Sequence, residues 1–84
     1  MLIATAGFLA LTAIWVPPGV LLARRFELGT ELDIEFSTGP DTPPRRLATR
    51  VVRVVPDKAG HWVHGCAFPK HLSDDEVNAL LRFA

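Results

Sequence analysis

Four side chains near the C-terminal end could bind a metal or take part in nucleophilic chemistry. They are His61, His64, Cys66 and His71. A closed zinc site needs four ligands that converge at about 2.0–2.3 Å, and a cysteine nucleophile needs an adjacent base. Residues 61–68 read as a strand, on which His64 and Cys66 share one face and His61 points the other way. We therefore interpret these residues as edge and turn histidines beside a packed cysteine, and we predict no metal site, no catalytic residue and no enzymatic activity.

Arginine and carboxylate side chains form two further patterns. Arg46 and Arg50 have an R-x-x-x-R spacing, and guanidinium groups pair well with phosphate. Residues four apart on a strand share a face, so the pattern indicates a solvated basic edge. Glu31, Asp33 and Glu35 alternate along another segment, which places the carboxylates in a row and not around a cation.

Composition excludes several classes of protein. The chain has 84 residues, enough for one small domain spanning residues 1–84. Its 9 Lys and Arg balance 9 Asp and Glu, which argues against a nonspecific nucleic-acid binder. A single cysteine excludes an intramolecular disulfide, and 49% apolar residues exclude a disordered chain.

The elements that would position these side chains are mostly strands. Residues 31–36 alternate strictly between acidic and apolar side chains, which predicts a strand with Leu32, Ile34 and Phe36 on its buried face. A loop rich in Gly and Pro is expected over residues 37–44.

A hairpin is expected after that loop. Residues 46–55 are rich in β-branched side chains and predict a second strand, with a bulge where the alternation slips between Arg50 and Arg53. Residues 56–60 form the predicted turn, and residues 61–68 return as the next strand.

One helix is expected over residues 73–84. Ser73 is a typical N-cap, and Glu76 three residues later completes a capping box. The helical period predicts an apolar face toward the sheet, formed by Val77, Leu80, Leu81 and Ala84.

The first part of the chain allows alternative interpretations. No ionisable side chain occurs from Met1 to Ala23, and Arg24 and Arg25 follow directly. One alternative is a single-span membrane helix within residues 1–23, which would leave the C-terminal part in the cytoplasm. A second alternative is a pair of buried β-segments separated by a turn at Pro17 and Pro18, since proline disfavours helix there. A third is a coding-region artefact over residues 1–17.

Four landmarks beyond the double proline resemble the PilZ domain, a bacterial receptor module for cyclic di-GMP. They are a strand after the family's glycine turn, an apolar-rich entry into the next strand, the penultimate strand, and the last strand with the start of the closing helix. In this chain they correspond to residues 19–22, 26–32, 48–54 and 62–73. The resemblance covers residues 18–81.

The resemblance implies a defined ligand chemistry. The family grips cyclic di-GMP with an Arg-x-x-x-Arg arm before the first strand and a turn of the form Asp/Asn-x-Ser-x-x-Gly. Aligning Gly19 with the motif glycine places Ile14 and Val16 at the Asp and Ser positions, and no arginine precedes Arg24. Gly19 is thus the one retained binding position that the resemblance implies.

These observations lead to one principal hypothesis. We expect an all-β fold with one C-terminal helix: a small antiparallel PilZ-like split barrel, incomplete at its start, with an atypical apolar segment at 1–17, strands over 18–71 and a closing helix at 73–84. The resemblance implies a cytoplasmic cyclic di-GMP module without a cofactor, and the lost motif predicts weak or no nucleotide binding. An exposed strand edge would then favour pairing with itself or with a protein partner. The alternative is an inner-membrane protein anchored through residues 1–23.

Overall fold

A computed structural model describes residues 1–37 and 39–84. Thr38, within the loop expected at 37–44, lies outside the described residues. In the described part the chain forms seven strands, a 3₁₀ turn at Lys58–Gly60 and a C-terminal helix. The strands and the helix are β1 (Leu2–Ala6), β2 (Leu9–Thr12), β3 (Ile14–Val16), β4 (Gly19–Leu22), β5 (Glu31–Phe36), β6 (Arg45–Pro56), β7 (Trp62–Ala67) and α1 (Asp74–Leu81).

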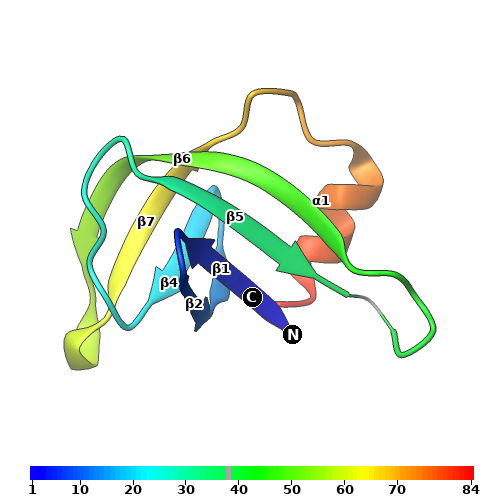
Figure 1. The fold of residues 1–84 in the computed structure, drawn as a ribbon, viewed down its shortest axis with the longest axis horizontal. Coiled ribbons are helices and arrows are strands. Elements are labelled where there is room, and N and C mark those ends of the chain that lie inside the picture. The colour runs from blue at the N-terminus through cyan, green and yellow to red at the C-terminus, as the bar shows by residue number, and fades with distance from the viewer. Residues whose placement is uncertain (38) are drawn as a thin grey trace.

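The strands form one antiparallel sheet that curls into a barrel (Figure 1). Their order is β2-β1-β5-β6-β7-β4-β3, so the two edge strands are consecutive in the chain and are separated only by Ala13. Because β2 lies at one edge of the sheet and the next strand in the chain, β3, lies at the other, the two edges come close together and the barrel is nearly closed. The backbone N–H of Trp15 donates to the carbonyl of Phe83 at 2.8 Å, which ties β3 to the C-terminal end of the chain.

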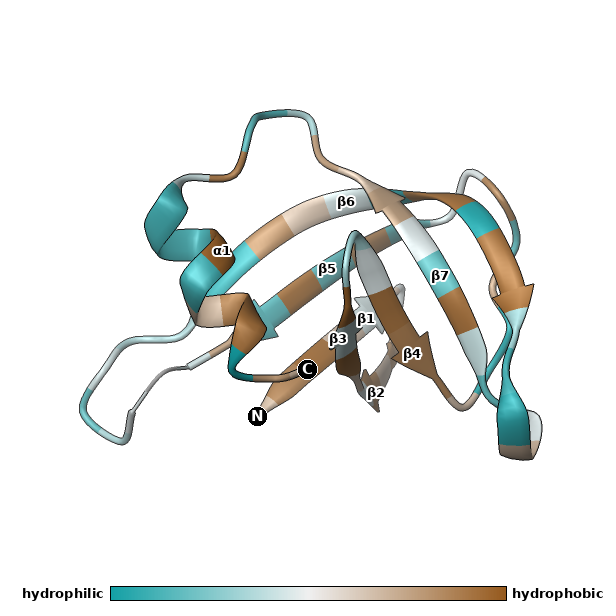
Figure 2. Ribbon diagram, turned by 180° about the vertical axis from the view of Figure 1, so that it is seen from behind, coloured by the Kyte–Doolittle hydropathy of each residue, from teal (hydrophilic) through white to brown (hydrophobic). Residues whose placement is uncertain are grey.

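The most regular strand follows its sequence pattern. Leu32, Ile34 and Phe36 of β5 are buried inside the barrel, with at most 1% of each side chain exposed, as the alternation predicts. Their acidic neighbours point outward, and Figure 2 shows the resulting alternation of hydrophilic and hydrophobic residues along β5. The core is thus built from one face of each strand.

The predicted bulge in β6 is also confirmed. The pairing of β6 with β7 shifts register between Val51 and Arg53. Val51 is buried, whereas the extra residue Val52 is 55% exposed. An inserted residue bends a strand and increases its twist, which helps this long strand follow the curl of the sheet.

The uncharged start of the chain forms strands, so the helical alternative is wrong and the β interpretation is confirmed. Leu2 and Ala4 of β1 are buried, and β1 lies between β2 and β5 in the sheet. Where two segments were expected there are four, because the chain turns again at Gly7, whose φ of 60° suits a tight hairpin, and because β2 and β3 are divided at Ala13. In the described part of the chain, no helix has the length and apolar character needed to cross a membrane.

The helix begins as predicted. The Glu76 backbone N–H donates to the Ser73 hydroxyl at 3.1 Å, and the Ser73 N–H donates to the Glu76 carboxylate at 2.9 Å. The predicted apolar face is only partly right. Leu80 is fully buried and Ala79 nearly so, but Val77 and Leu81 are 39% and 50% exposed and Ala84 is exposed.

The orientation of α1 explains this error. The helix lies at one end of the curled sheet and not flat on it, so only a narrow stripe contacts the core (Figure 1). The chain then continues to Phe83, whose ring lies 6.1 Å from that of Phe36 in an edge-on arrangement. The barrel end is therefore filled by the last turn and by the residues that follow it.

Replacing Ser73 with alanine should destabilise the fold by about 1 kcal/mol, because the first turn loses its capping acceptor. Urea unfolding followed by tryptophan fluorescence measures this loss. Ser73→Thr is the matched control, since a threonine hydroxyl can still accept from the Glu76 N–H. Equal stability of the alanine and wild-type proteins would contradict the role given to this cap.

Candidate functional site

The positions that align with the family's binding turn lie on the β3–β4 hairpin. Ile14 and Val16 sit on β3, with the buried Trp15 between them, so their side chains face away from the core. Ile14 is 48% exposed and Val16 is half-buried. Neither side chain can donate or accept a hydrogen bond, so this hairpin offers no polar side chain to a guanine edge.

The strands beside the hairpin extend this apolar surface. The register places Ile14 opposite Leu21, Leu21 opposite Val63, and Val63 opposite Val55. These four aliphatic side chains form one row across β3, β4, β7 and β6 on the outside of the barrel. We call it the aliphatic row. Directly opposed apolar pairs stabilise a sheet, and here they also set the character of its outer surface.

Gly19 is required by packing at the start of β4. It pairs with Gly65 of β7, and a Cβ atom at position 19 would overlap the backbone carbonyl oxygen of His64. A glycine in a strand commonly marks such a close approach of a second backbone. The structure thus gives Gly19 a role in joining β4 to β7 that needs no ligand.

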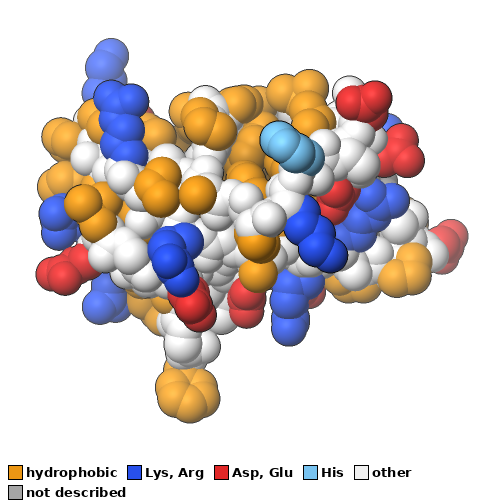
Figure 3. Space-filling model, turned by 90° about the horizontal axis from the view of Figure 1, so that it is seen from above, with side chains coloured by type: hydrophobic (Ala, Val, Ile, Leu, Met, Phe, Trp, Pro, Cys, Tyr) orange, Lys and Arg blue, Asp and Glu red, His pale blue; other side chains and the backbone are white. Residues whose placement is uncertain are grey.

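The R-x-x-x-R arginines are engaged in cross-strand pairs. Arg46 lies opposite Glu35 and Arg50 opposite Glu31. The guanidinium–carboxylate distances are 3.2 Å and 3.8 Å. The space-filling view likewise shows positive and negative side chains next to one another (Figure 3). The interpretation as a solvated edge therefore fits, and both arginines have acidic neighbours that compete with any phosphate.

Sequence reasoning missed a second pair of arginines, which it had considered only as the flank of a membrane segment. The Arg24 guanidinium lies 5.8 Å from the centre of the Phe26 ring, and that of Arg25 lies 5.8 Å from the centre of the Trp62 ring. Cations at such distances over aromatic rings are attracted by the ring electrons. Arg24 lies only two residues before Phe26 in the chain, which was a local signal, but the contact of Arg25 with Trp62 depends on the β4–β7 register.

His64 is fully buried, which corrects its interpretation as an edge histidine. Its Nε2 accepts the backbone N–H of Phe26 at 2.9 Å, and its Nδ1 lies 3.1 Å from the carbonyl oxygen of Trp62. One nitrogen accepts while the other donates, so the ring is neutral. Burial is the main cause that lowers the pKa of His64, and the nearby Arg25 acts in the same direction.

The remaining metal-ligand candidates do not gather around His64. Cys66 lies two residues after His64 on β7 and is also buried, and burial raises the pKa of its thiol. His61 lies just before β7, after the 3₁₀ turn, and its Nδ1 is 3.1 Å from the carbonyl oxygen of Ala59. Among residues 1–37 and 39–84, no three His, Cys, Asp or Glu side chains form a group that could hold a metal ion.

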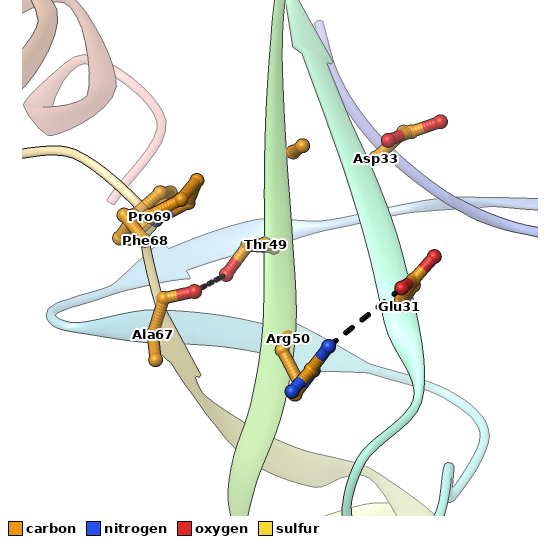
Figure 4. Close-up of a pocket in the computed structure, with 8 residues that line it drawn as sticks. Glu31, Asp33, Thr49, Arg50, Ala67, Phe68 and Pro69 are labelled. Atoms are coloured by element: carbon orange, nitrogen blue, oxygen red, sulfur yellow. Dashed lines mark hydrogen bonds and ion pairs between the residues drawn. The ribbon is translucent and has the colours of Figure 1, made fainter.

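An open hollow of about 450 Å³ lies between β6 and the end of β7 (Figure 4). The Thr49 hydroxyl donates to the carbonyl of Ala67 at 2.8 Å at its base. Its rim carries the Arg50–Glu31 pair and the carboxylate of Asp33. With two carboxylates and one engaged arginine, this hollow is unsuited to a ligand with two phosphates.

The curled antiparallel sheet with a single C-terminal helix places the protein among small β-barrel domains. The family model for the PilZ domain matches residues 13–84, which is most of the chain. The chain therefore belongs to the PilZ domain family, a family of cyclic di-GMP receptor modules. No curated protein matches it, and no solved structure matches it.

Proposed function

We propose that this chain is a non-enzymatic, cytoplasmic PilZ signalling module that binds cyclic di-GMP weakly or not at all and acts through contacts with protein. The proposal of weak or absent nucleotide binding depends on one observation. The outward positions that should bear the family's Asp and Ser bear Ile14 and Val16 instead, beside further aliphatic side chains on β4 and β7.

The guanidinium groups support the same conclusion. Cyclic di-GMP presents two phosphates and two guanine edges, which arginine recognises through paired hydrogen bonds. Arg46 and Arg50 are paired with carboxylates on β5, on a different part of the sheet from the β3–β4 hairpin. Gly19 is the one motif position retained, and it could offer a nucleotide only its backbone.

Because these polar side chains are absent, the outer face of the β3–β4 hairpin and its neighbouring strands is apolar and suits contact with another protein. The aliphatic row is half-exposed on a strand face that α1 does not cover. An exposed apolar patch of this kind on a small soluble domain commonly marks an interaction site. We therefore place the remaining function in contact with a protein, through the apolar side of the barrel.

Calorimetric titration with cyclic di-GMP tests the nucleotide part. We expect no binding tighter than about 100 µM, because each missing charged hydrogen bond removes about 1.5–3 kcal/mol and every 1.4 kcal/mol is a factor of ten in Kd. A PilZ domain with an intact motif serves as the positive control.

A micromolar Kd for the wild-type chain would overturn this proposal. The variant Arg50→Ala would then show whether the late R-x-x-x-R carries the binding. A loss of affinity would assign the nucleotide to the β5–β6 side of the barrel, away from the family's usual turn.

A further inference from the structure

Strand β6 has 12 residues and its neighbour β7 only 6, so part of the β6 edge has no strand beside it. The two strands pair from Pro56 back to Arg50, and the ladder ends where Arg50 meets Ala67. The chain then leaves the sheet, and Pro69, two residues later, has no N–H to donate. On this side of the sheet, no strand in the described part of the chain pairs with residues 45–49, which we call the unpaired edge of β6.

The backbone groups of Ala48 and Arg46 point outward from this unpaired edge. The N–H and the C=O of Val51 both bond to the segment that leads into β5, at 2.9 and 2.8 Å. Bonding direction alternates along an antiparallel ladder, so counting back from Val51 places Ala48 and Arg46 on the opposite side, toward β7. Both residues are exposed, and among the described residues their backbone N–H and C=O groups have no hydrogen-bond partner. Four strong hydrogen-bonding groups are therefore free to pair with another chain.

Both ends of the unpaired edge open into hollows. At Ala48 lies the hollow of about 450 Å³ described above, with Phe68 and Pro69 on one side of β6 and Asp33 on the other (Figure 4). At Arg45 lies a smaller hollow of about 230 Å³, between β6 and α1. Open space thus flanks the free backbone groups at both ends. A slender extended chain can lie there, along the line that β7 would have followed.

The outward face of this edge favours a basic side chain. Asp33 lies directly opposite Ala48 on β5, is exposed, and has no ion pair among the described residues. An added strand would place a residue on the other side of Ala48, about 10 Å from Asp33, which is two strand spacings. A lysine or arginine can span that distance, because only the methyl group of Ala48 lies between. The next residue of the added strand would face inward beside the half-buried Leu47, which favours an apolar side chain there.

We propose that β6 binds an extended segment of a partner protein as an additional antiparallel strand, paired with Ala48 and Arg46. Read from its N-terminus, the segment has a basic residue opposite Ala48, an apolar residue opposite Leu47 and a polar residue opposite Arg46. It has no proline at the two paired positions, because main-chain hydrogen bonds supply most of the affinity in this mode of recognition. The inference rests on the proposed role in protein contact, but it uses a different surface from the aliphatic row.

Titration of the intact chain with a synthetic peptide, followed by NMR of the backbone amides, tests the pairing. The probe is the hexapeptide Ser-Thr-Lys-Val-Thr-Ser, blocked at both ends, in which Lys, Val and the second Thr match the three positions. Binding should saturate with a dissociation constant below about 1 mM, and hydrogen exchange at the Ala48 and Arg46 amides should slow at least about tenfold at saturation. The Trp15 amide should not change, because it is already bonded to the Phe83 carbonyl.

The charge requirement is tested on both partners. Asp33→Asn should raise the dissociation constant about two- to fivefold, the loss expected for one exposed ion pair. Asp57→Asn is the matched control, because Asp57 is an exposed carboxylate in the turn between β6 and β7, at the opposite end of β6, and should leave the affinity unchanged. A peptide with Glu in place of Lys should bind the wild-type chain more weakly than the Lys peptide.

The backbone requirement is tested at Ala48. Ala48→Pro removes the outward N–H and fills its place with the proline ring, so the dissociation constant should rise at least about tenfold. The sheet should tolerate this change, because proline is accepted where a strand N–H faces away from its neighbours. Ala48→Ser keeps the N–H and should bind the peptide as the wild type does. Protection of the Trp15 amide in each variant shows that it still folds.

Three results would overturn the inference. They are a dissociation constant above about 1 mM for the Lys peptide, equal affinities for the Lys and Glu peptides, or an unchanged affinity in a folded Ala48→Pro variant. Peptide-induced changes confined to the aliphatic row would also overturn it, but they would support the protein contact proposed above, so the two proposals fail separately. None of these results bears on the cyclic di-GMP titration, which decides the nucleotide behaviour.

Discussion

Replacing Gly19 with alanine should destabilise the domain by at least about 3 kcal/mol, out of the 5–10 kcal/mol expected for a protein of this size. The added Cβ would overlap the carbonyl oxygen of His64, which is backbone within β7. A flexible side chain can move aside, whereas this carbonyl belongs to a strand held between β4 and β6. The variant must therefore separate β4 from β7. Urea unfolding, or a fall in the melting temperature, measures the loss.

Two other glycines give a graded comparison. A Cβ at Gly65 would lie 3.1 Å from the Cβ of Arg53, a side-chain atom on the neighbouring strand, so Gly65→Ala should cost less than Gly19→Ala. At Gly39 the nearest atom is the Thr42 hydroxyl at 3.4 Å, so Gly39→Ala should leave stability almost unchanged. If all three variants were equally stable, the packing role of Gly19 would be excluded.

The parts of the fold that sequence predicted are those with a local signal. The strand at Glu31–Phe36 has charged residues on its solvent face and apolar residues on its core face, so the alternation in its sequence is unambiguous. The start of the helix was readable because a capping box lies within four consecutive residues. The bulge was visible because β-branched residues continued where the alternation slipped.

The parts that failed depend on distant contacts. Residues 1–22 contain no charge to mark a solvent face, so their four short strands could not be told from a helix. The buried stripe of α1 depends on the helix meeting the end of the barrel and not its side. Periodicity alone made Val77 and Leu81 part of the core, although both are exposed.

For the candidate site too, features with a local signal could be predicted from the sequence, whereas features that depend on distant contacts could not. The apolar character of the motif turn was readable from Ile14 and Val16, because the resemblance fixed which positions matter. The packing role of Gly19 was not, since it depends on the register of β4 with β7. The burial of His64 has the same origin, because its Nε2 bonds an amide 38 residues away in the chain.

The stability of the domain should fall as the pH drops below about 6.5, through the titration of His64. Burial lowers the pKa of His64 in the folded protein from its ordinary value of 6.5, so the unfolded chain takes up the proton first. Well above pH 6.5 both states are neutral at this residue and its contribution is constant. Between 6.5 and the folded-state pKa the unfolded state binds more protons, and stability falls by up to about 1.4 kcal/mol per pH unit. Below the folded-state pKa the loss levels off.

The structure gives this loss a local cause, which a matched pair of variants can isolate. A proton on Nε2 would face the Phe26 N–H that this nitrogen now accepts at 2.9 Å, so protonation must break the bond between β7 and the Arg24–Phe26 segment. His64→Gln cannot titrate in this range, so its free energy of unfolding, measured with urea between pH 7.5 and 5, should show a shallower decline than the wild type. His71→Gln, at an exposed position, should keep the wild-type slope. Parallel curves for His64→Gln and wild type would show that another group governs the acid sensitivity, since the buried ring would then make no difference to proton uptake on unfolding.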